Sequence, residues 1–162
     1  MHSTTHTQHI TTQDSALSAA GRFGRFSYLA WNCLIALLMI PVFLVLTLLF
    51  PGLMNIDPAG GIPLPPLVLG ALIYLGVLYL MFIFTIRRLH DRNHTGWLSL
   101  LMLVPVANLL LMLYLFFAPG DQRVNSYGPP RATAGWEAAL AWIYIILLVL
   151  LFAFAIFGAV LA

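Results

Sequence analysis

Four long apolar runs alternate with short polar stretches along the chain. The runs cover residues 28–50, 64–86, 97–117 and 137–161, and each has 21 or more residues. A helix of about 20 residues crosses the roughly 30 Å hydrocarbon layer of a bilayer. Because lipid offers no partner for backbone N–H and C=O groups, such runs are expected to be helical. The pattern predicts an all-α integral membrane protein with a bundle of four transmembrane helices.

Polar segments divide the chain into three parts. Residues 1–20 are rich in Ser, Thr, His and Gln and lack the apolar core of a signal peptide, so we expect a mobile polar tail. Residues 21–130 contain the first three apolar runs, and residues 131–162 supply an additional C-terminal transmembrane helix. The histidines of the tail have no supporting partners in the sequence around them, which makes a poor metal site.

The composition supports a membrane protein and argues against nucleic acid as a partner. Of the 162 residues, 62% are hydrophobic and 7% are charged, whereas a soluble domain is about 25% charged. The net charge of +2 comes from arginine alone, because the chain has no lysine, and it is too small for a nucleic-acid surface. The single cysteine, Cys33, cannot form an intramolecular disulfide and is expected to be a small apolar packing residue.

Arginine positions predict the orientation in the membrane. The segment 21–27 carries two arginines, the loop 51–63 carries none, and the segment 87–97 carries three. Short loops that are rich in Lys or Arg stay in the cytoplasm. We therefore expect a cytoplasmic N-terminus, an external first loop and a cytoplasmic second loop.

Aromatic residues stand at the edges of the apolar runs. They are Tyr28, Trp31, Trp97 and Trp136. Amphipathic rings prefer the headgroup level of a bilayer, so we expect these residues to be interfacial anchors.

The third run allows two structures because Pro105 lies near its middle. Proline lacks an N–H donor and disfavours a helical conformation at the residue before it. One structure is a full but kinked span, which puts Arg123 and Arg131 outside, against the arginine rule. The other is a re-entrant hairpin with its turn at 105–108, which returns both arginines to the cytoplasm and sends the C-terminus outside. We favour the kinked span, because three other helices are few to bury such a hairpin.

The most charged stretch, "RRLHDRNHTGW" at residues 87–97, poses a question of chemistry. His90 and His94 would share a helical face, with Asp91 beside the first, as in a zinc hydrolase. However, the stretch offers no third ligand, and the residues Asn93 to Gly96 favour a turn over a regular helix. We therefore predict a loop at the membrane surface, with neither a metal nor another cofactor.

Three motifs resemble one family. They are "RFGRFSYLAW" from residue 22, "RRLHDRNHTGW" from residue 87, and "PVANLLLMLYLFFAPGDQRVNSYGPP" from residue 105. In this order they are similar to the bacterial domain of unknown function 805, a group of small inner-membrane proteins. The resemblance covers about residues 21–130. It implies a bacterial inner-membrane location and no particular activity, since the family has no established one.

The resemblance carries over residue by residue. The matching positions are Arg22, Gly24, Arg25, Arg87, Arg88, Leu89, His90, Asp91, Gly96, Trp97, Pro105, Pro119, Gly120, Asn125, Tyr127 and Gly128. His94 falls at a variable position of the central motif, which argues further against a two-histidine metal site.

Three functions from different classes remain open. The first is a non-catalytic helper or structural protein of the cell envelope, which works through helix and lipid contacts and pairs with a membrane protein or a second copy. The second is a small transporter or channel subunit, with Asn108 as its most polar residue near mid-depth. The third is a lipid-headgroup binder or membrane-embedded enzyme that uses the arginine cluster, because guanidinium groups match phosphate oxygens.

The candidate site residues form two groups. The candidate lipid or anion contacts are Arg22, Arg25, Arg87, Arg88 and Arg92. The expected structural cluster is His90, Asp91, Gly96, Trp97, Pro105, Asn125, Tyr127 and Gly128. No catalytic residue is assigned, because no nucleophile or second carboxylate stands at a telling spacing.

Overall fold

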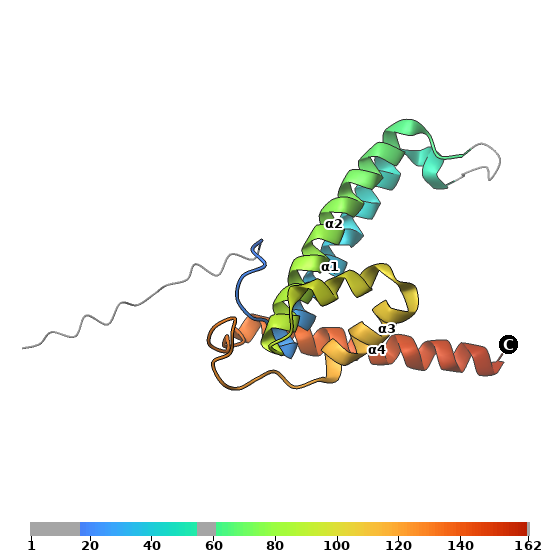
Figure 1. Ribbon diagram of the computed structural model, residues 1–162. Helices are drawn as coiled ribbons and strands as arrows, with labels where there is room; N and C mark the ends of the chain where they lie inside the picture. Colours follow the sequence, from blue (N-terminus) through green and yellow to red (C-terminus); the bar gives the residue numbers. More distant parts are fainter. Residues whose placement is uncertain (1–16, 55–60, 162) are drawn as a thin grey trace, which may run out of the picture.

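The regular elements of the protein are helices throughout the residues that the computed structural model describes, 17–54 and 61–161. They are α1 (Arg25–Leu49), the 3-10 helix η1 (Pro51–Met54), α2 (Leu64–Asp91), the 3-10 helix η2 (Gly96–Leu103), α3 (Pro105–Phe117) and α4 (Gly135–Leu161) (Figure 1). The expected all-α class is therefore confirmed over this part of the chain. Most of the expected polar tail and part of the expected external loop 51–63 lie outside the described residues.

Three of these helices are long and apolar enough to cross a membrane. The three segments are Arg25–Leu49, Leu64–Asp91 and Gly135–Ala159. Their length and composition identify a membrane protein. The expected bundle of four transmembrane helices is not confirmed, because the third apolar run divides into η2 and α3, and α3 is shorter than these three spans.

The third run folds into a hairpin. It begins as η2, breaks at Val104, whose φ of −105° and ψ of 115° are extended, and continues as α3 from Pro105. Both ends of the run lie at the C-terminal end of α2: Thr95 leads into η2 there, and Arg92 Nη1 donates to the carbonyl of Pro119 at 2.6 Å. Figure 1 shows η2 running away from α2 and α3 returning. The run therefore turns back and does not continue as the kinked span that we favoured. Its turn lies at Val104, whereas the expected turn residues 105–108 belong to α3.

The tip of the hairpin satisfies its own backbone. The N–H of Val104 donates to the carbonyl of Leu101 at 3.1 Å, and the carbonyl of Val104 accepts from Asn108 N–H at 2.7 Å. Pro105 has no N–H that would need a partner. A turn that is exposed to lipid is unstable when its backbone N–H and C=O groups lack hydrogen-bond partners. The internal bonds explain how the apolar tip stays largely exposed.

The helices pack most closely near one end of the molecule. There α1 begins, α2 ends, and the first part of α4 lies against α1 (Figure 1). One apolar cluster joins the segment before α1 to α2 and α3 through buried residues; it is Phe23, Tyr28, Ile83, Phe84, Leu89, Leu111 and Leu115. A second cluster joins α1 to α4 through Leu29, Ala30 and Ala141. Beyond Leu148, the described side chains of α4 are exposed.

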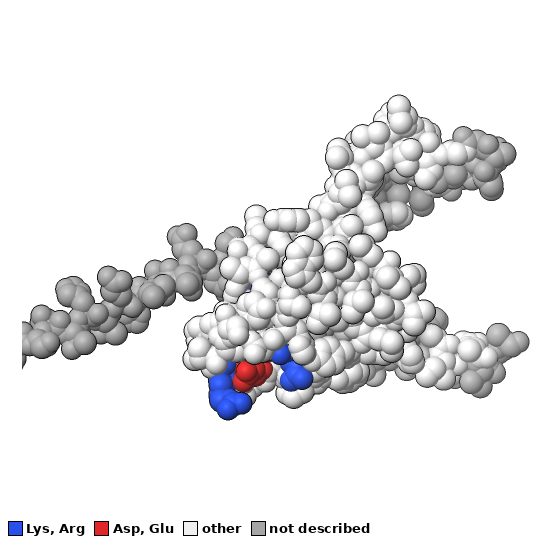
Figure 2. Space-filling view, viewed as in Figure 1, with Lys and Arg blue, Asp and Glu red and all other residues white. Residues whose placement is uncertain are grey.

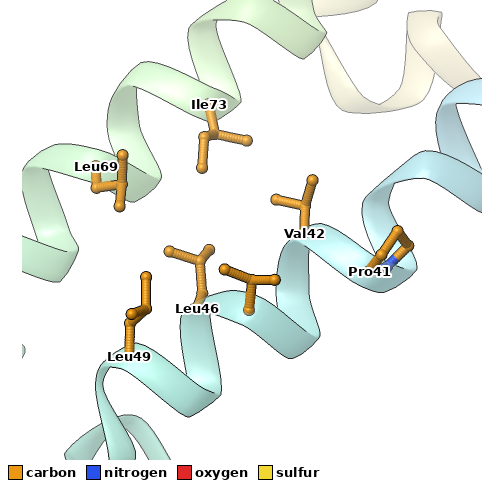
Figure 3. Close-up of a pocket in the computed structure, with 7 residues that line it drawn as sticks. Pro41, Val42, Leu46, Leu49, Leu69 and Ile73 are labelled. Carbon is orange, nitrogen blue, oxygen red and sulfur yellow. The ribbon is translucent and has the colours of Figure 1, made fainter.

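The far halves of α1 and α2 pack more loosely. A groove of about 280 Å³ lies between them and is lined by apolar side chains alone. Figure 3 shows Val42, Leu46 and Leu49 of α1 facing Leu69 and Ile73 of α2 across it. Nothing polar joins the helices in this groove, so the pair is held together mainly at its other end.

Candidate functional site

Charged side chains gather at the packed end, where α1 begins and α2 ends. Figure 2 shows the blue and red residues at one edge of an otherwise white surface. The segment before α1 is fixed there by a backbone bond, since Phe23 N–H donates to the carbonyl of Arg87 at 3.0 Å. The hairpin brings the loop 118–134 to the same place. We call this end, with Arg22, Arg88 and Asp91 at its centre, the arginine layer.

Asp91 is held between two arginines. Arg22 donates to Asp91 Oδ1 from Nε at 3.1 Å and from Nη2 at 3.0 Å. Arg88 Nη1 donates to Asp91 Oδ2 at 2.5 Å. All three side chains are buried. A buried carboxylate needs such partners, because an unpaired charge out of water costs several kcal/mol.

The two arginines also bind backbone carbonyls, Arg88 at the end of α3 and Arg22 in the loop that follows it. Arg88 donates to the carbonyls of Leu115 at 3.0 Å and Ala118, which belong to the last turn and C-cap of α3. Arg22 donates to the carbonyls of Arg123 at 2.8 Å, Gly128 at 3.0 Å and Asp121. The last carbonyls of a helix have no partner within it and attract cations. The arginines thus tie the hairpin and the following loop to α2.

Gly120 explains why the loop can approach Asp91 so closely. A Cβ at this position would lie 2.0 Å from Asp91 Oδ2. The neighbouring Asp121 N–H donates to the carbonyl of Asp91 at 2.8 Å. Only glycine leaves room for this contact. Gly120 of the third motif is therefore needed for the loop to pack against Asp91 of the second motif.

The end of the third motif forms a turn over His90. Asn125 accepts from Tyr127 N–H at 2.9 Å, and its side chain donates to the carbonyl of His90 at 2.8 Å. Gly128 closes the turn with a φ of +108°, a conformation that favours glycine. The ring of Tyr127 stacks on His90 with centroids 3.7 Å apart and planes 7° from parallel. These contacts bring together four residues of the expected structural cluster, His90, Asn125, Tyr127 and Gly128.

Arg87 faces an aromatic group. Its guanidinium lies 3.8 Å from the centroid of the buried Phe23 ring, and Arg131 approaches the same ring at 5.3 Å. Phe23 also stacks with Trp31 at 6.2 Å. A cation over an aromatic face is attracted by the negative face of the ring. The buried arginine is therefore stabilised by an aromatic side chain of the segment before α1.

A second ionic network was missed in the sequence. The fully buried Glu137 of α4 accepts from Ser27 at 2.9 Å, from Trp31 Nε1 at 2.9 Å and from Arg131 Nη1 at 2.9 Å. It also caps the first turn of its own helix, since Ala134 N–H donates to it at 3.0 Å. The signal that could have found it is the lone glutamate at the start of an apolar run, six residues after an arginine.

Two of the four aromatic residues that were expected to be interfacial anchors make contacts inside the protein instead. Tyr28 is buried, and Trp31 donates to Glu137 and contacts Phe84 with centroids 5.5 Å apart. Trp97, by contrast, is 78% exposed and stays free to anchor the start of η2. Trp136 is exposed too, although its ring contacts that of Trp31.

The five candidate lipid contacts fall into two groups. Arg22, Arg87 and Arg88 are buried, and every guanidinium nitrogen of Arg22 and Arg88 has an acceptor inside the protein. Arg25 is exposed, and Arg92 is partly exposed over the ring of Tyr114. The surface of the layer is therefore formed by the second group.

The remaining candidates are spread along the hairpin. Pro105 lies at its tip, away from the layer, while Gly96 lies beside Ile86 and His90. His94 donates to or accepts from the hydroxyl of Tyr114 at 2.8 Å, apart from the network of Asp91. Among the described residues, no group of three His, Cys, Asp or Glu side chains is placed to hold a metal ion.

The site as a whole consists of two ionic networks, one around Asp91 and one around Glu137. Asp91 and Glu137 are each saturated by arginine and by hydrogen bonds inside the described protein. Together the two networks fix the ends of α1, α2, α3 and α4 relative to one another.

Comparison with known proteins identifies the family. The model of the family "Protein of unknown function (DUF805)" matches residues 16–129. The match spans more than two thirds of the chain, so the protein belongs to this family, as the three motifs indicated. No curated protein and no solved structure matches the chain.

Proposed function

We propose that this protein is a non-catalytic helper of the bacterial cell envelope, which lies in the inner membrane and acts through helix and lipid contacts. The observation that carries the proposal is the contrast between its charged and apolar parts. Its buried carboxylates are locked by internal arginines, while the far parts of α1, α2 and α4 expose apolar side chains. Chemistry or transport needs polar groups that can reach a substrate, whereas these groups are committed to the fold.

The orientation follows from the arginine layer. All seven arginines of the chain lie at this end, linked by the contacts of Asp91, Glu137, Phe23 and the α3 carboxyl end. Positive segments stay in the cytoplasm. With three spans and a hairpin that enters and leaves on the same side, the N-terminus is cytoplasmic and the C-terminus is external. The arginine rule is then obeyed at every loop, which the four-span arrangement did not allow.

Anionic lipid is the partner proposed for the surface of the layer. Arg25 and Arg92 present guanidinium groups there, and Arg123 is exposed beside them in the loop after α3. Each arginine near an anionic membrane surface contributes about 1 kcal/mol. This revises the earlier candidate set, because the buried arginines work inside the protein.

A protein partner is proposed for the far part of α4. This helix leaves the α1–α2 pair after its first turns, and its described side chains beyond Leu148 contact no other helix closely (Figure 1). Small residues help helices approach closely in lipid. Ala155 and Ala159 are spaced four apart on this exposed part and fit such a contact with a membrane protein or a second copy.

Cysteine labelling in intact cells tests the orientation. On a Cys33→Ala background, we expect a cysteine at Ala162, after the candidate span, to react with an impermeant maleimide from outside. The exposed Ser126→Cys should react only after permeabilisation. Protection of Ala162→Cys from the external reagent would overturn the three-span orientation.

Native mass spectrometry tests the lipid and protein contacts. Membranes with mixed zwitterionic and anionic lipids are extracted in mild detergent, and retained lipids and proteins are identified. We expect Arg25→Ala with Arg92→Ala to lower the retention of anionic lipid, and the exposed Gln122→Ala to leave it unchanged. Equal retention by all three would leave the arginines as a topology signal only. Steady turnover of an added substrate by the purified protein would replace the helper function.

A further inference from the structure

We infer that the cleft beside His90 binds the hydroxyl head of an uncharged long-chain alcohol or glyceride, with the chain lying along α2. The cleft has a volume of about 470 Å³ and lies between the last part of α2, η2 and the Tyr127 turn. Its lining is Phe82, Ile86, His90, Thr95, Gly96, Trp97, Ser99, Leu100 and Tyr127. Its size falls within the range of small-molecule sites, about 300–1,000 Å³.

The cleft is polar at one end and apolar along its length. His90, Thr95 and Tyr127 lie at the end next to the arginine layer. Phe82 lies eight residues before His90 on α2. At a rise of 1.5 Å per residue, it is about 12 Å further from the arginine layer than His90 is. Leu100 lines the side formed by η2 and is 48% exposed, so the cleft is open to the surrounding lipid. This gradient matches a molecule with one polar head and one apolar chain.

The histidine ring is oriented to accept a hydrogen bond. His90 Nδ1 lies 3.4 Å from the carbonyl oxygen of Gly21, which can only accept, so we assign the ring proton to Nδ1. The other nitrogen, Nε2, is then an acceptor in the neutral ring. Stacking on Tyr127 and the bond from Asn125 to the His90 carbonyl fix the ring and its backbone. An alcohol O–H is the donor that this nitrogen lacks within the cleft.

Gly96 keeps the space in front of that nitrogen open. A Cβ at Gly96 would lie 3.4 Å from His90 Nε2 and 3.0 Å from Ile86 Cγ2. Any side chain there would occupy the position of the head group. The glycine of the second motif, which has a φ outside the left-handed region, is thus explained by space rather than by backbone conformation.

The chemistry of the lining favours an uncharged head. Apart from the histidine, the cleft is lined by hydroxyl, aromatic and aliphatic side chains. No arginine is among the residues that line the cleft; the Arg87 guanidinium lies over Phe23, and Arg22 binds Asp91. A phosphate would have no cation to pair with in this cleft. The inference is independent of the proposed helper function, because it concerns neither α4 nor the exposed arginines.

Photolabelling of the purified full-length protein in zwitterionic nanodiscs tests the cleft. The probe is hexadecanol with a diazirine in its chain, compared with the hydrocarbon and the alkyl phosphate that carry the same group. We expect the alcohol to label residues 96–103 about three- to tenfold more than the hydrocarbon, as one net hydrogen bond allows. A monoacylglycerol with the same diazirine distinguishes a glyceride from a free alcohol: stronger labelling by either identifies the source.

Two variants make the test specific. His90→Phe keeps a ring to stack on Tyr127 but removes the acceptor, so the preference for the alcohol should disappear. Leu100→Trp fills the cleft from an exposed position and should reduce labelling by both probes, whereas Leu109→Trp, exposed on α3 outside the cleft, should not. If His90→Phe does not fold, the tryptophan pair decides. Equal labelling by alcohol and hydrocarbon in the wild type, or preference for the phosphate, would overturn the inference.

Discussion

The two ends of the α1–α2 pair are held together by different interactions, ionic at one end and apolar at the other. At the arginine layer, Asp91 joins Arg22 and Arg88, and three buried charges connect α2, α3 and the segment before α1. At the other end, the helices face each other across a groove lined by Leu46, Leu69 and similar side chains (Figure 3). Lipid tails are as apolar as leucine, so apolar contact alone gives little preference for one neighbour over another. The comparison teaches that polar contacts at one end define this fold.

Among the substitutions considered, replacing Asp91 should destabilise the arginine layer most strongly. Asp91→Asn removes the only carboxylate that Arg22 and Arg88 share in the described structure, and it leaves two buried cations without compensation. Breaking such a buried pair costs about 3–5 kcal/mol. We expect a large fall in the free energy of unfolding, measured by denaturant titration in detergent. Asp121→Asn is the matched control and should change little, because this partly exposed carboxylate accepts from Arg123 N–H and pairs with no arginine side chain in the described structure. Equal stability of the two variants would mean that the layer does not hold the fold.

Replacing Glu137 should loosen the packing of α4 against α1. Glu137→Gln keeps the shape but loses the charge that pairs with Arg131, whose side chain is 27% exposed. Because water reaches the arginine, we expect a smaller cost, about 2 kcal/mol. Spin labels at the exposed positions Leu38 and Leu150, on a Cys33→Ala background, should report a broader distance distribution between the helices. An unchanged distribution would show that the apolar contacts of Ala30 and Ala141 suffice.

Two leucines of α3 sharpen the comparison within one helix. Leu115 is fully buried against the layer, whereas Leu113 is 47% exposed two residues earlier. Leu115→Ala leaves a cavity and should cost about 2 kcal/mol, while Leu113→Ala should stay within about 0.5 kcal/mol. Thermal unfolding of both variants in the same detergent provides the measurement. If the two melting temperatures fall equally, the hairpin does not pack as described.

The smallest effect is expected at His94. Its ring bonds to the Tyr114 hydroxyl on the surface of the hairpin, apart from Asp91. His94→Ala should lower stability by less than about 1 kcal/mol, as for one exposed hydrogen bond. A chelator should leave the melting temperature of the wild type unchanged. Stoichiometric zinc in the purified protein, measured by elemental analysis, would contradict this and return the two-histidine site to consideration.

The sequence carried the motifs but not their burial. Arg22, Arg88, His90 and Asp91 were all singled out, because their family pattern stands within an otherwise apolar chain. Which arginines are interior depends on where the loop after α3 lies, and that loop supplies the acceptors for Arg22. A residue list gives no information on such contacts across about a hundred positions of chain. The sequence alone therefore could not distinguish the buried arginines from the exposed ones.

The sequence by itself determined the class of the protein, because four apolar runs in a chain with few charges require helices in a membrane. It also placed the break at Pro105, since proline disfavours a helical residue before it. Only the tertiary structure decided that the chain turns back at this break, because Pro105 permits both a kink and a full break at Val104, and contacts with distant residues select between them. The bonds from Arg88 to the end of α3, and from Asp91 to the loop beyond it, select the hairpin. The pairing of Arg131 with Glu137 was likewise decided by packing, because it depends on α4 lying against Ser27 and Trp31 of α1.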